Sequence, residues 1–121
     1  MIQSLKYCKR PSTTAIVIHV LGNLPPSATP YWIDAVSRGL ALYSPPFHFI
    51  VDQRGEVHDT PRDSRAVGLY CRDSIDLCVL CKGNEPTKKQ QTEINYLVEA
   101  LKLDYSTIQL EVRTLICSQK T

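Results

Sequence analysis

Three histidines are candidates for metal binding, and the fold decides whether each of them can act as a ligand. His19 stands inside the apolar run AIVIHVL at 15–21, which predicts a buried strand. A histidine in such a strand can ligate a metal through a ring nitrogen, but ligation needs further donors. Without them His19 is a core or rim residue, and the two interpretations stay open at this point.

The other two histidines lie on either side of a predicted turn. Arg54 and Gly55 form a two-residue connection between strand-like segments, which is typical of a β-hairpin. In that register His58 faces Val51, and His48 then lies on the opposite face of the sheet. The two histidines are not expected to share a metal.

Cysteine spacing invites a zinc or redox interpretation that strand geometry opposes. Cys78 and Cys81 form a C-x-x-C motif, but positions i and i+3 of a strand point to opposite faces. We therefore expect small buried side chains there. The five cysteines are an odd number, which argues against a disulfide framework and for reduced thiols: Cys8, Cys71, Cys78, Cys81 and Cys117.

Charged side chains gather around the predicted hairpin and the segment after it. The guanidinium groups of four arginines could lie together at one rim of the molecule and bind anions. Alternatively, these arginines could be solvated and paired with nearby aspartates. The arginines are Arg54, Arg62, Arg65 and Arg72. The carboxylate pairs Asp59/Asp63 and Asp73/Asp76 are expected to be solvated or to cap turns.

The elements that must position these side chains alternate between strands and helices. Hydrophobic periodicity, Pro and Gly positions and capping residues define their bounds. We expect strands at 15–21, 47–53, 56–59, 75–81 and 108–112, a loop at 60–74, a helix from Pro30 to the residues before Pro45, and a second helix after the capping box at 87–90. This order predicts a single α/β domain with a central mixed β-sheet flanked by helices.

The pattern also predicts which side chains face the core. The expected helix faces are Trp32, Val36, Leu40 and Tyr43 in the first helix and Ile94, Leu97, Val98 and Leu101 in the second. In the fourth strand, one face is expected to hold Ile75, Leu77, Val79 and Cys81, and the other face Asp76, Cys78 and Leu80. In the last strand, the side chains expected to be buried are Ile108, Leu110 and Val112.

Composition bounds the class of protein. The chain has 121 residues, 43% of them hydrophobic and 21% charged, which suits one globular domain. No apolar run reaches 18 residues, so no membrane span is expected. The first ten residues lack the apolar region of a secretory signal, which predicts a cytoplasmic location. A net charge of +2 is too small to indicate a nucleic acid partner.

Three stretches follow one another in order along the chain: TTAIVIHVLG, PPFHFIVDQRGEVHDTPRDSRAVGLYCRDSIDLCVLCKG and PTKKQQTEINYLVEAL. Together they resemble the small phage N-acetylmuramoyl-L-alanine amidases, which belong with the peptidoglycan recognition proteins and type-2 amidases. The resemblance implies a mixed sheet with a groove on one face. In that family the groove holds zinc, and the enzyme cleaves the amide between the lactyl group of the sugar and the first alanine of the stem peptide.

The resemblance also assigns positions in the groove. His19 matches the first zinc ligand and is the only family ligand position retained, because Arg113 or a close neighbour stands where the family has a histidine. The third ligand, a cysteine, would fall near Thr121, with Cys117 nearby. Phe47 takes the place of the catalytic tyrosine and lacks its hydroxyl group. The family's lysine after the second ligand has no clear counterpart.

These departures predict a protein that is not an enzyme and holds no cofactor or metal. We expect it to capture an anionic ligand, a muropeptide or a nucleotide-type signal, in the former active-site groove, as a phage could do to counter host defence. The expected ligand-binding residues are His19, Phe47, Arg62, Arg65, Tyr70, Arg72 and Arg113. By the same resemblance the chain divides into an N-terminal arm, 1–12, and an amidase-like domain, 13–121, that lacks the family's C-terminal metal-ligand segment.

Two alternatives remain open. One is an inhibitor that binds a host protein such as RNA polymerase, with residues 1–10 as its binding arm. The other is a zinc-dependent amidase that uses His19, Cys117 and a further ligand. The sequence does not indicate an oligomeric state.

Overall fold

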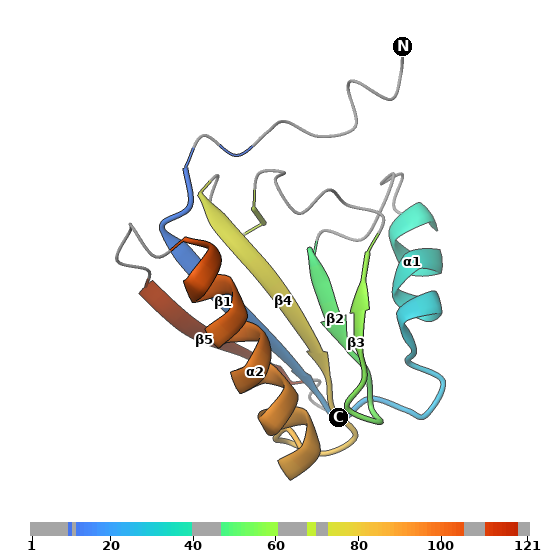
Figure 1. The fold of residues 1–121 in the computed structure, drawn as a ribbon. Helices are drawn as coiled ribbons and strands as arrows, with labels where there is room; N and C mark the ends of the chain where they lie inside the picture. Colours follow the sequence, from blue (N-terminus) through green and yellow to red (C-terminus); the bar gives the residue numbers. More distant parts are fainter. Residues whose placement is uncertain are drawn as a thin grey trace.

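A five-stranded mixed sheet forms the centre of the molecule (Figure 1). The computed structural model describes residues 10, 12–39, 47–60, 68–69, 73–105 and 111–118. The strands lie in the order β3-β2-β4-β1-β5, and all are parallel except β3, which pairs antiparallel with β2. The elements are β1 (Ala15–Gly22), α1 (Pro30–Gly39), β2 (Phe49–Val51), β3 (Val57–Asp59), β4 (Ser74–Leu80), α2 (Lys88–Asp104) and β5 (Glu111–Ser118).

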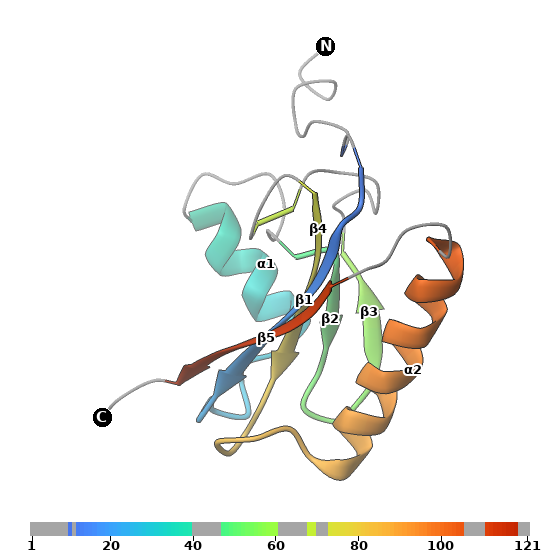
Figure 2. The same cartoon turned by 90° about the vertical axis from the view of Figure 1, so that its left-hand side faces the viewer.

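The two helices lie on opposite faces of this sheet (Figure 2). On the α2 face, three side chains of the helix pack on alternate residues of β1 and β4; they are Ile94, Val98 and Leu101. On the α1 face, Ile33 packs against Ile50 and Leu80. Burying an aliphatic side chain of this size stabilises the fold by about 1.5–3 kcal/mol. The expected α/β class with a mixed, helix-flanked sheet is therefore confirmed.

Strand β4 follows its predicted alternation and occupies the centre of the sheet. Ile75, Leu77, Val79 and Cys81 belong to the core under α2, whereas Cys78 and Leu80 belong to the core under α1. Both thiols are buried. Burial raises the pKa of the Cys81 thiol, which keeps it protonated and unreactive. The prediction that these cysteines point to opposite faces and serve as core side chains is confirmed.

The predicted capping residues are also where the sequence placed them. Thr87 accepts a hydrogen bond from the backbone N–H of Gln90, and the Gln90 side chain accepts one from the backbone N–H of Thr87. This reciprocal pair satisfies two N–H groups at the start of α2. At the start of α1, the Thr29 hydroxyl accepts from the N–H of Trp32 at 3.2 Å.

The face of α1 differs from its prediction. Ile33 is the buried side chain near the start of the helix, whereas Trp32 is 38% exposed. The buried position in the first turn of α1 is therefore one residue later in the sequence than the hydrophobic pattern predicted. The side chain of Val36, and residues 40–46 with the expected helix end, lie outside the described part of the chain.

The last strand lies later in the chain than predicted. β5 begins at Glu111 and pairs along its whole length with β1. It is therefore an edge strand of the sheet, next to β1. Val112 is 41% exposed, so the expected burial of that side chain is wrong. Ile108 and Leu110 fall outside the described residues.

The hairpin register is shifted by one residue from the prediction. His58 pairs with Ile50 and not with Val51, because the connection is a longer turn closed by the hydrogen bond from the backbone N–H of Asp52 to the carbonyl oxygen of Glu56. The shift places His58 on the face that carries Ile50. The prediction that His48 and His58 lie on opposite faces is therefore wrong.

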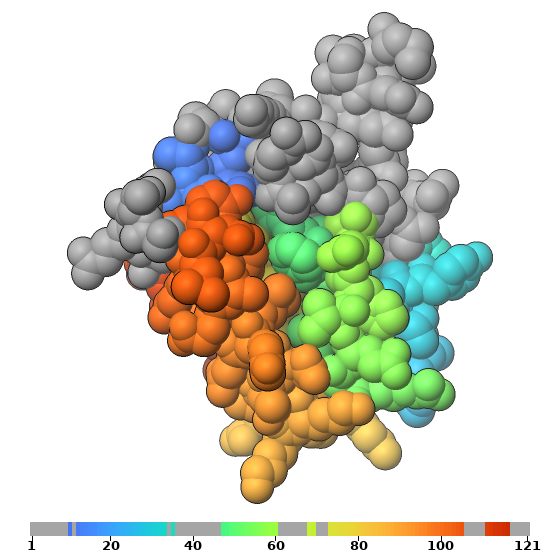
Figure 3. Space-filling view, in the orientation of Figure 1, coloured from blue at the N-terminus to red at the C-terminus, as the bar shows by residue number. Residues whose placement is uncertain are grey.

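The hairpin turn lies beside the first turn of α2 (Figure 3). Gly55 has a φ of +87°, and a β-carbon there would come within 2.9 Å of the Lys89 Cγ atom. Only glycine suits both the left-handed backbone and this close approach. No helix among the described residues is long and apolar enough to cross a membrane.

Candidate functional site

The centre of the α1 face holds a buried pair of ionisable side chains. His19 on β1 and Asp76 on β4 come from neighbouring strands, since His19 pairs with Cys78, two residues beyond Asp76. The His19 Nε2 atom lies 2.7 Å from the Asp76 Oδ1 atom. Asp76 is fully buried and His19 is 7% exposed. An apolar strand pair therefore contains an imidazole held by a carboxylate.

Within the described part of the chain, donors from three residues converge on the carboxylate of Asp76. His19 binds one oxygen, while the other accepts from the backbone N–H of Leu69 at 2.7 Å and from the Ser74 hydroxyl at 2.9 Å. Burial raises the pKa of Asp76, but the hydrogen bonds from His19, Leu69 and Ser74 outweigh it and hold that pKa below its ordinary value. Asp76 is consequently ionised at neutral pH.

The ionised carboxylate fixes the ring of His19. A carboxylate only accepts hydrogen bonds, so the Nε2 atom of His19 carries the proton that joins it to Asp76. This assignment follows from the hydrogen-bond network. In the neutral ring the lone pair then resides on Nδ1, which is the form of a general base held by a carboxylate.

His48, the residue before β2, contacts the same pair. The backbone N–H of Asp76 donates to the His48 Nδ1 atom at 2.9 Å, and the backbone N–H of His48 donates to the carbonyl oxygen of Asp76 at 2.8 Å. His48 is 1% exposed. This reciprocal contact locks the backbone of Asp76 in place and orients its carboxylate toward His19.

Phe47 forms one wall beside the imidazole. The ring centroids of Phe47 and His19 lie 5.2 Å apart with the planes tilted by 60°, a favourable aromatic arrangement. The Phe47 carbonyl oxygen accepts a bond from the Thr60 hydroxyl at 2.7 Å. Phe47 thus packs against the His19 ring and restricts its orientation.

Arg113 lies on the same face as His19, one strand away. It pairs with Val17 in the sheet register, while Leu115 pairs with His19. Its guanidinium group is about half exposed and forms an ion pair with Glu111 on its own strand. The other arginines of the predicted site, Arg62, Arg65 and Arg72, together with Tyr70, lie outside the described residues.

The zinc centre that the resemblance implies needs three donors that converge on one ion. A histidine that gives one ring N–H to a carboxylate can ligate a metal through its other nitrogen. His19, however, belongs to no group of three converging donors among residues 10–60, 68–69, 73–105 and 111–118 as far as these are described. Leu115 is its neighbour on β5, and the Cys117 side chain is not described. The described residues do not fit zinc at His19.

Asp76 is the residue of this site that sequence reasoning misjudged. It was expected to be solvated or to cap a turn, yet it is fully buried. The signal was present in the alternation of β4, because Asp76 shares its face with Cys78 and Leu80, which both pack in the core. A lone carboxylate between apolar positions of a central strand requires a buried partner.

Two solved structures share this fold. They are N-acetylmuramoyl-L-alanine amidase LysC and the endolysine N-acetylmuramoyl-L-alanine amidase LysCS, both from Clostridium intestinale URNW. Each superposes on 89% of this chain with a TM-score of 0.68 and 17% sequence identity, and the match covers 77% and 76% of the two neighbours. No protein-family model and no curated protein matches the chain. The chain therefore has the amidase fold.

The expectation that the chain is not an enzyme is contradicted by these neighbours, because both are amidases. That expectation equated departures from the family's ligand positions with loss of activity. The structure places a different ionisable pair on the same sheet, and nothing in the described residues shows a loss of activity. The likeness likewise supports the amidase fold and not a degenerate relative.

Proposed function

We propose that the chain hydrolyses an amide bond of peptidoglycan-derived muropeptides, with His19 as general base and Asp76 as the residue that orients it. The observation that carries this proposal is the 2.7 Å contact between the His19 Nε2 atom and the buried Asp76 carboxylate. The fold shared with two N-acetylmuramoyl-L-alanine amidases supports the choice of substrate class.

The proposed reaction uses the free nitrogen of the His19 ring. The Nδ1 atom accepts a proton from water while the water oxygen adds to the carbonyl carbon of the amide. Asp76 remains ionised and stabilises the imidazolium that forms. His19 then returns the proton to the departing nitrogen, the C–N bond breaks, and a carboxylate and a free amine result. General base catalysis of this kind contributes roughly 10²–10⁴-fold in rate.

The position of Arg113 favours binding of an anionic ligand on the sheet face that carries His19. Stem peptides carry carboxylates, and a guanidinium group binds a carboxylate through two parallel hydrogen bonds. Because Arg113 pairs with Glu111 on its own strand, an incoming carboxylate must compete with that side chain. We propose that Arg113 positions the peptide and takes no part in the proton transfer.

The test is the release of new L-alanine amino groups from purified peptidoglycan, measured by amine labelling and mass spectrometry. The wild-type protein is assayed in chelator and again with added zinc. We expect release in chelator, its loss in His19→Gln, and no change in Glu99→Gln, whose carboxylate is largely exposed on α2. Absence of release in both conditions overturns the proposed hydrolysis, and release only with zinc overturns the metal-independent role of His19.

A further inference from the structure

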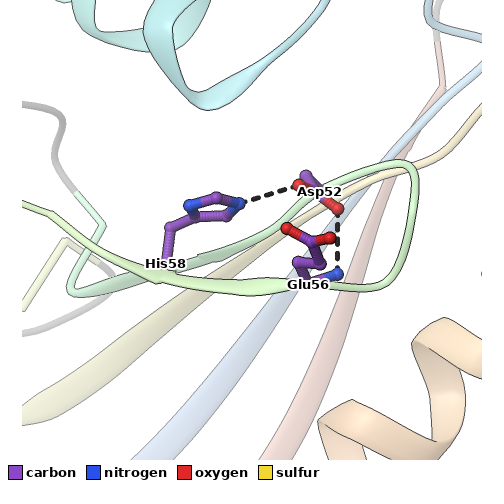
Figure 4. Close-up of side chains that lie close together, drawn as sticks. All are labelled: Asp52, Glu56 and His58. Carbon is purple, nitrogen blue, oxygen red and sulfur yellow. Dashed lines mark hydrogen bonds and ion pairs between the residues drawn. The ribbon is translucent and has the colours of Figure 1, made fainter.

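A second group of ionisable side chains lies at the β2–β3 turn (Figure 4). Asp52, Glu56 and His58 each offer one ligand atom, and these atoms all lie within 4.8 Å of one another. Figure 4 shows the three side chains converging on one side of the hairpin. The group includes an imidazole nitrogen as well as carboxylate oxygens, so it presents a mixed nitrogen and oxygen donor set.

The local sequence fixes one carboxylate of this group. The Asp52 Oδ1 atom accepts from the backbone N–H groups of Arg54 and Glu56, both at 2.9 Å. Its Oδ2 atom is therefore directed to the other side of the turn, where the His58 Nε2 atom lies 2.7 Å away. The positive φ of Gly55 makes this tight turn possible.

The turn is also held rigidly by its neighbours. The Gln90 side chain at the start of α2 donates to the carbonyl oxygens of Asp52 at 2.8 Å and of Leu80 at 2.7 Å. The Gln53 side chain donates to the carbonyl oxygen of Pro25 at 2.7 Å, before α1. A site held by two such anchors loses little conformational entropy when a ligand orders it.

A cavity of about 480 Å³ opens beside the three donors. Its lining consists of the donor side chains, the rest of the turn and the loop before α1. The Arg54 side chain also lines it but is exposed, so it can turn into solvent. The space accommodates an ion together with water molecules or a further ligand atom. The donors therefore face open space that an ion can enter.

We propose that Asp52, Glu56 and His58 bind one divalent transition-metal ion of the zinc type. Zinc bonds to histidine nitrogen and carboxylate oxygen at about 2.0–2.2 Å, so donors on one ion lie closer together than 4.8 Å. Glu56 is exposed and His58 is partly exposed, so both side chains can close this gap by rotation. The metal takes the place of the hydrogen-bonding proton between Asp52 and His58, and any displaced proton goes to solvent.

The donor set also selects among metals. Calcium prefers six to eight oxygen ligands and magnesium keeps several waters, whereas an imidazole nitrogen suits zinc, nickel and cobalt. Two carboxylates balance the double charge of the ion. The site is separate from His19 and Asp76 and does not depend on the proposed hydrolysis.

The test uses chelator-treated full chain, titrated with zinc alone and, in parallel, with calcium and magnesium. Because the chain has five cysteines, isothermal titration is paired with NMR of the His58 ring and of the turn amides. We expect one zinc ion to shift the His58 ring signals, and Glu56→Gln and His58→Gln to weaken that event by at least about tenfold. Both variants keep the Asp52 carboxylate that closes the turn.

Two matched controls separate the site from general metal binding. Glu99→Gln removes an exposed carboxylate elsewhere and is expected to leave the titration unchanged. Circular dichroism spectra that match those of the wild type show that both site variants are folded. Zinc that binds equally to the wild type, Glu56→Gln and His58→Gln, or that leaves the His58 ring signals unshifted, overturns the proposal. Calcium binding as tight as zinc overturns the zinc-type assignment.

Discussion

The substitution Asp76→Asn tests the network around His19 most severely. The native carboxylate accepts bonds from His19, Leu69 and Ser74, and all three donors approach a fully buried side chain. An amide keeps one accepting oxygen, but its NH₂ group then faces a donor at the other position. Leaving a buried donor without an acceptor typically costs about 1–3 kcal/mol.

The expected loss is about 3 kcal/mol of the free energy of unfolding, the upper end of that range, because more than one donor approaches the buried carboxylate. Domains of this kind are stabilised by roughly 5–15 kcal/mol in total, so the change is large. Urea unfolding at pH 7, followed by circular dichroism, measures it. Asp59→Asn, at an exposed position of β3, is the matched control, and it is expected to change the free energy by less than about 0.5 kcal/mol. An Asp76→Asn protein as stable as that control refutes the reasoning.

Three further predictions concern stability. Because the folded-state pKa of Asp76 lies below its ordinary value, its contribution is present above that ordinary pKa and is lost as pH falls through the folded-state value. The urea midpoint of the wild type should therefore fall more steeply toward acid pH than that of Asp76→Asn, and parallel curves contradict this. Gly55→Ala should cost about 1–2 kcal/mol, because alanine resists a φ of +87° and its β-carbon meets Lys89; an unchanged thermal midpoint contradicts it. Thr87→Ala should cost about 1 kcal/mol through loss of the cap of α2, whereas Thr87→Ser should retain most of it, and calorimetry of the two variants compares them.

Hydrophobic patterning predicted β4 and α2 correctly, because burial of apolar side chains dominates in both elements. Strand β4 is a nearly continuous apolar run because both of its faces are buried. Helix α2 has both a clear apolar face and a capping box. These signals are local, so a short window of sequence contains them. The resemblance to amidases added the mixed sheet, and the solved neighbours bear out that fold.

The hairpin register needed information that periodicity does not contain. Arg54 and Gly55 fit a two-residue turn, but the Asp52 carboxylate caps two backbone N–H groups and closes a longer one. A side chain thereby decides the register of two strands. Compared with the predicted register, the observed one is shifted by one residue, so His58 lies on the other face of the sheet, close to Asp52 and Glu56.

The His19–Asp76 pair was missed for a related reason. The sequence separates the two residues by 57 positions, and only the pairing of β1 with β4 brings them together. The family resemblance assigns site positions at His19, Phe47 and the end of the last strand, and none at Asp76. A buried charge in an apolar strand is a stronger indication of a site than a missing ligand position.

The tautomer of the His19 ring tests the central claim most directly. Long-range ¹H–¹⁵N correlation NMR at neutral pH, with His19→Gln used to assign the signals, reports which ring nitrogen carries the proton. The account predicts a proton on Nε2, shared with Asp76, and an unprotonated Nδ1 atom. A neutral ring that carries its proton on Nδ1 would contradict the role of His19 as a base held by Asp76.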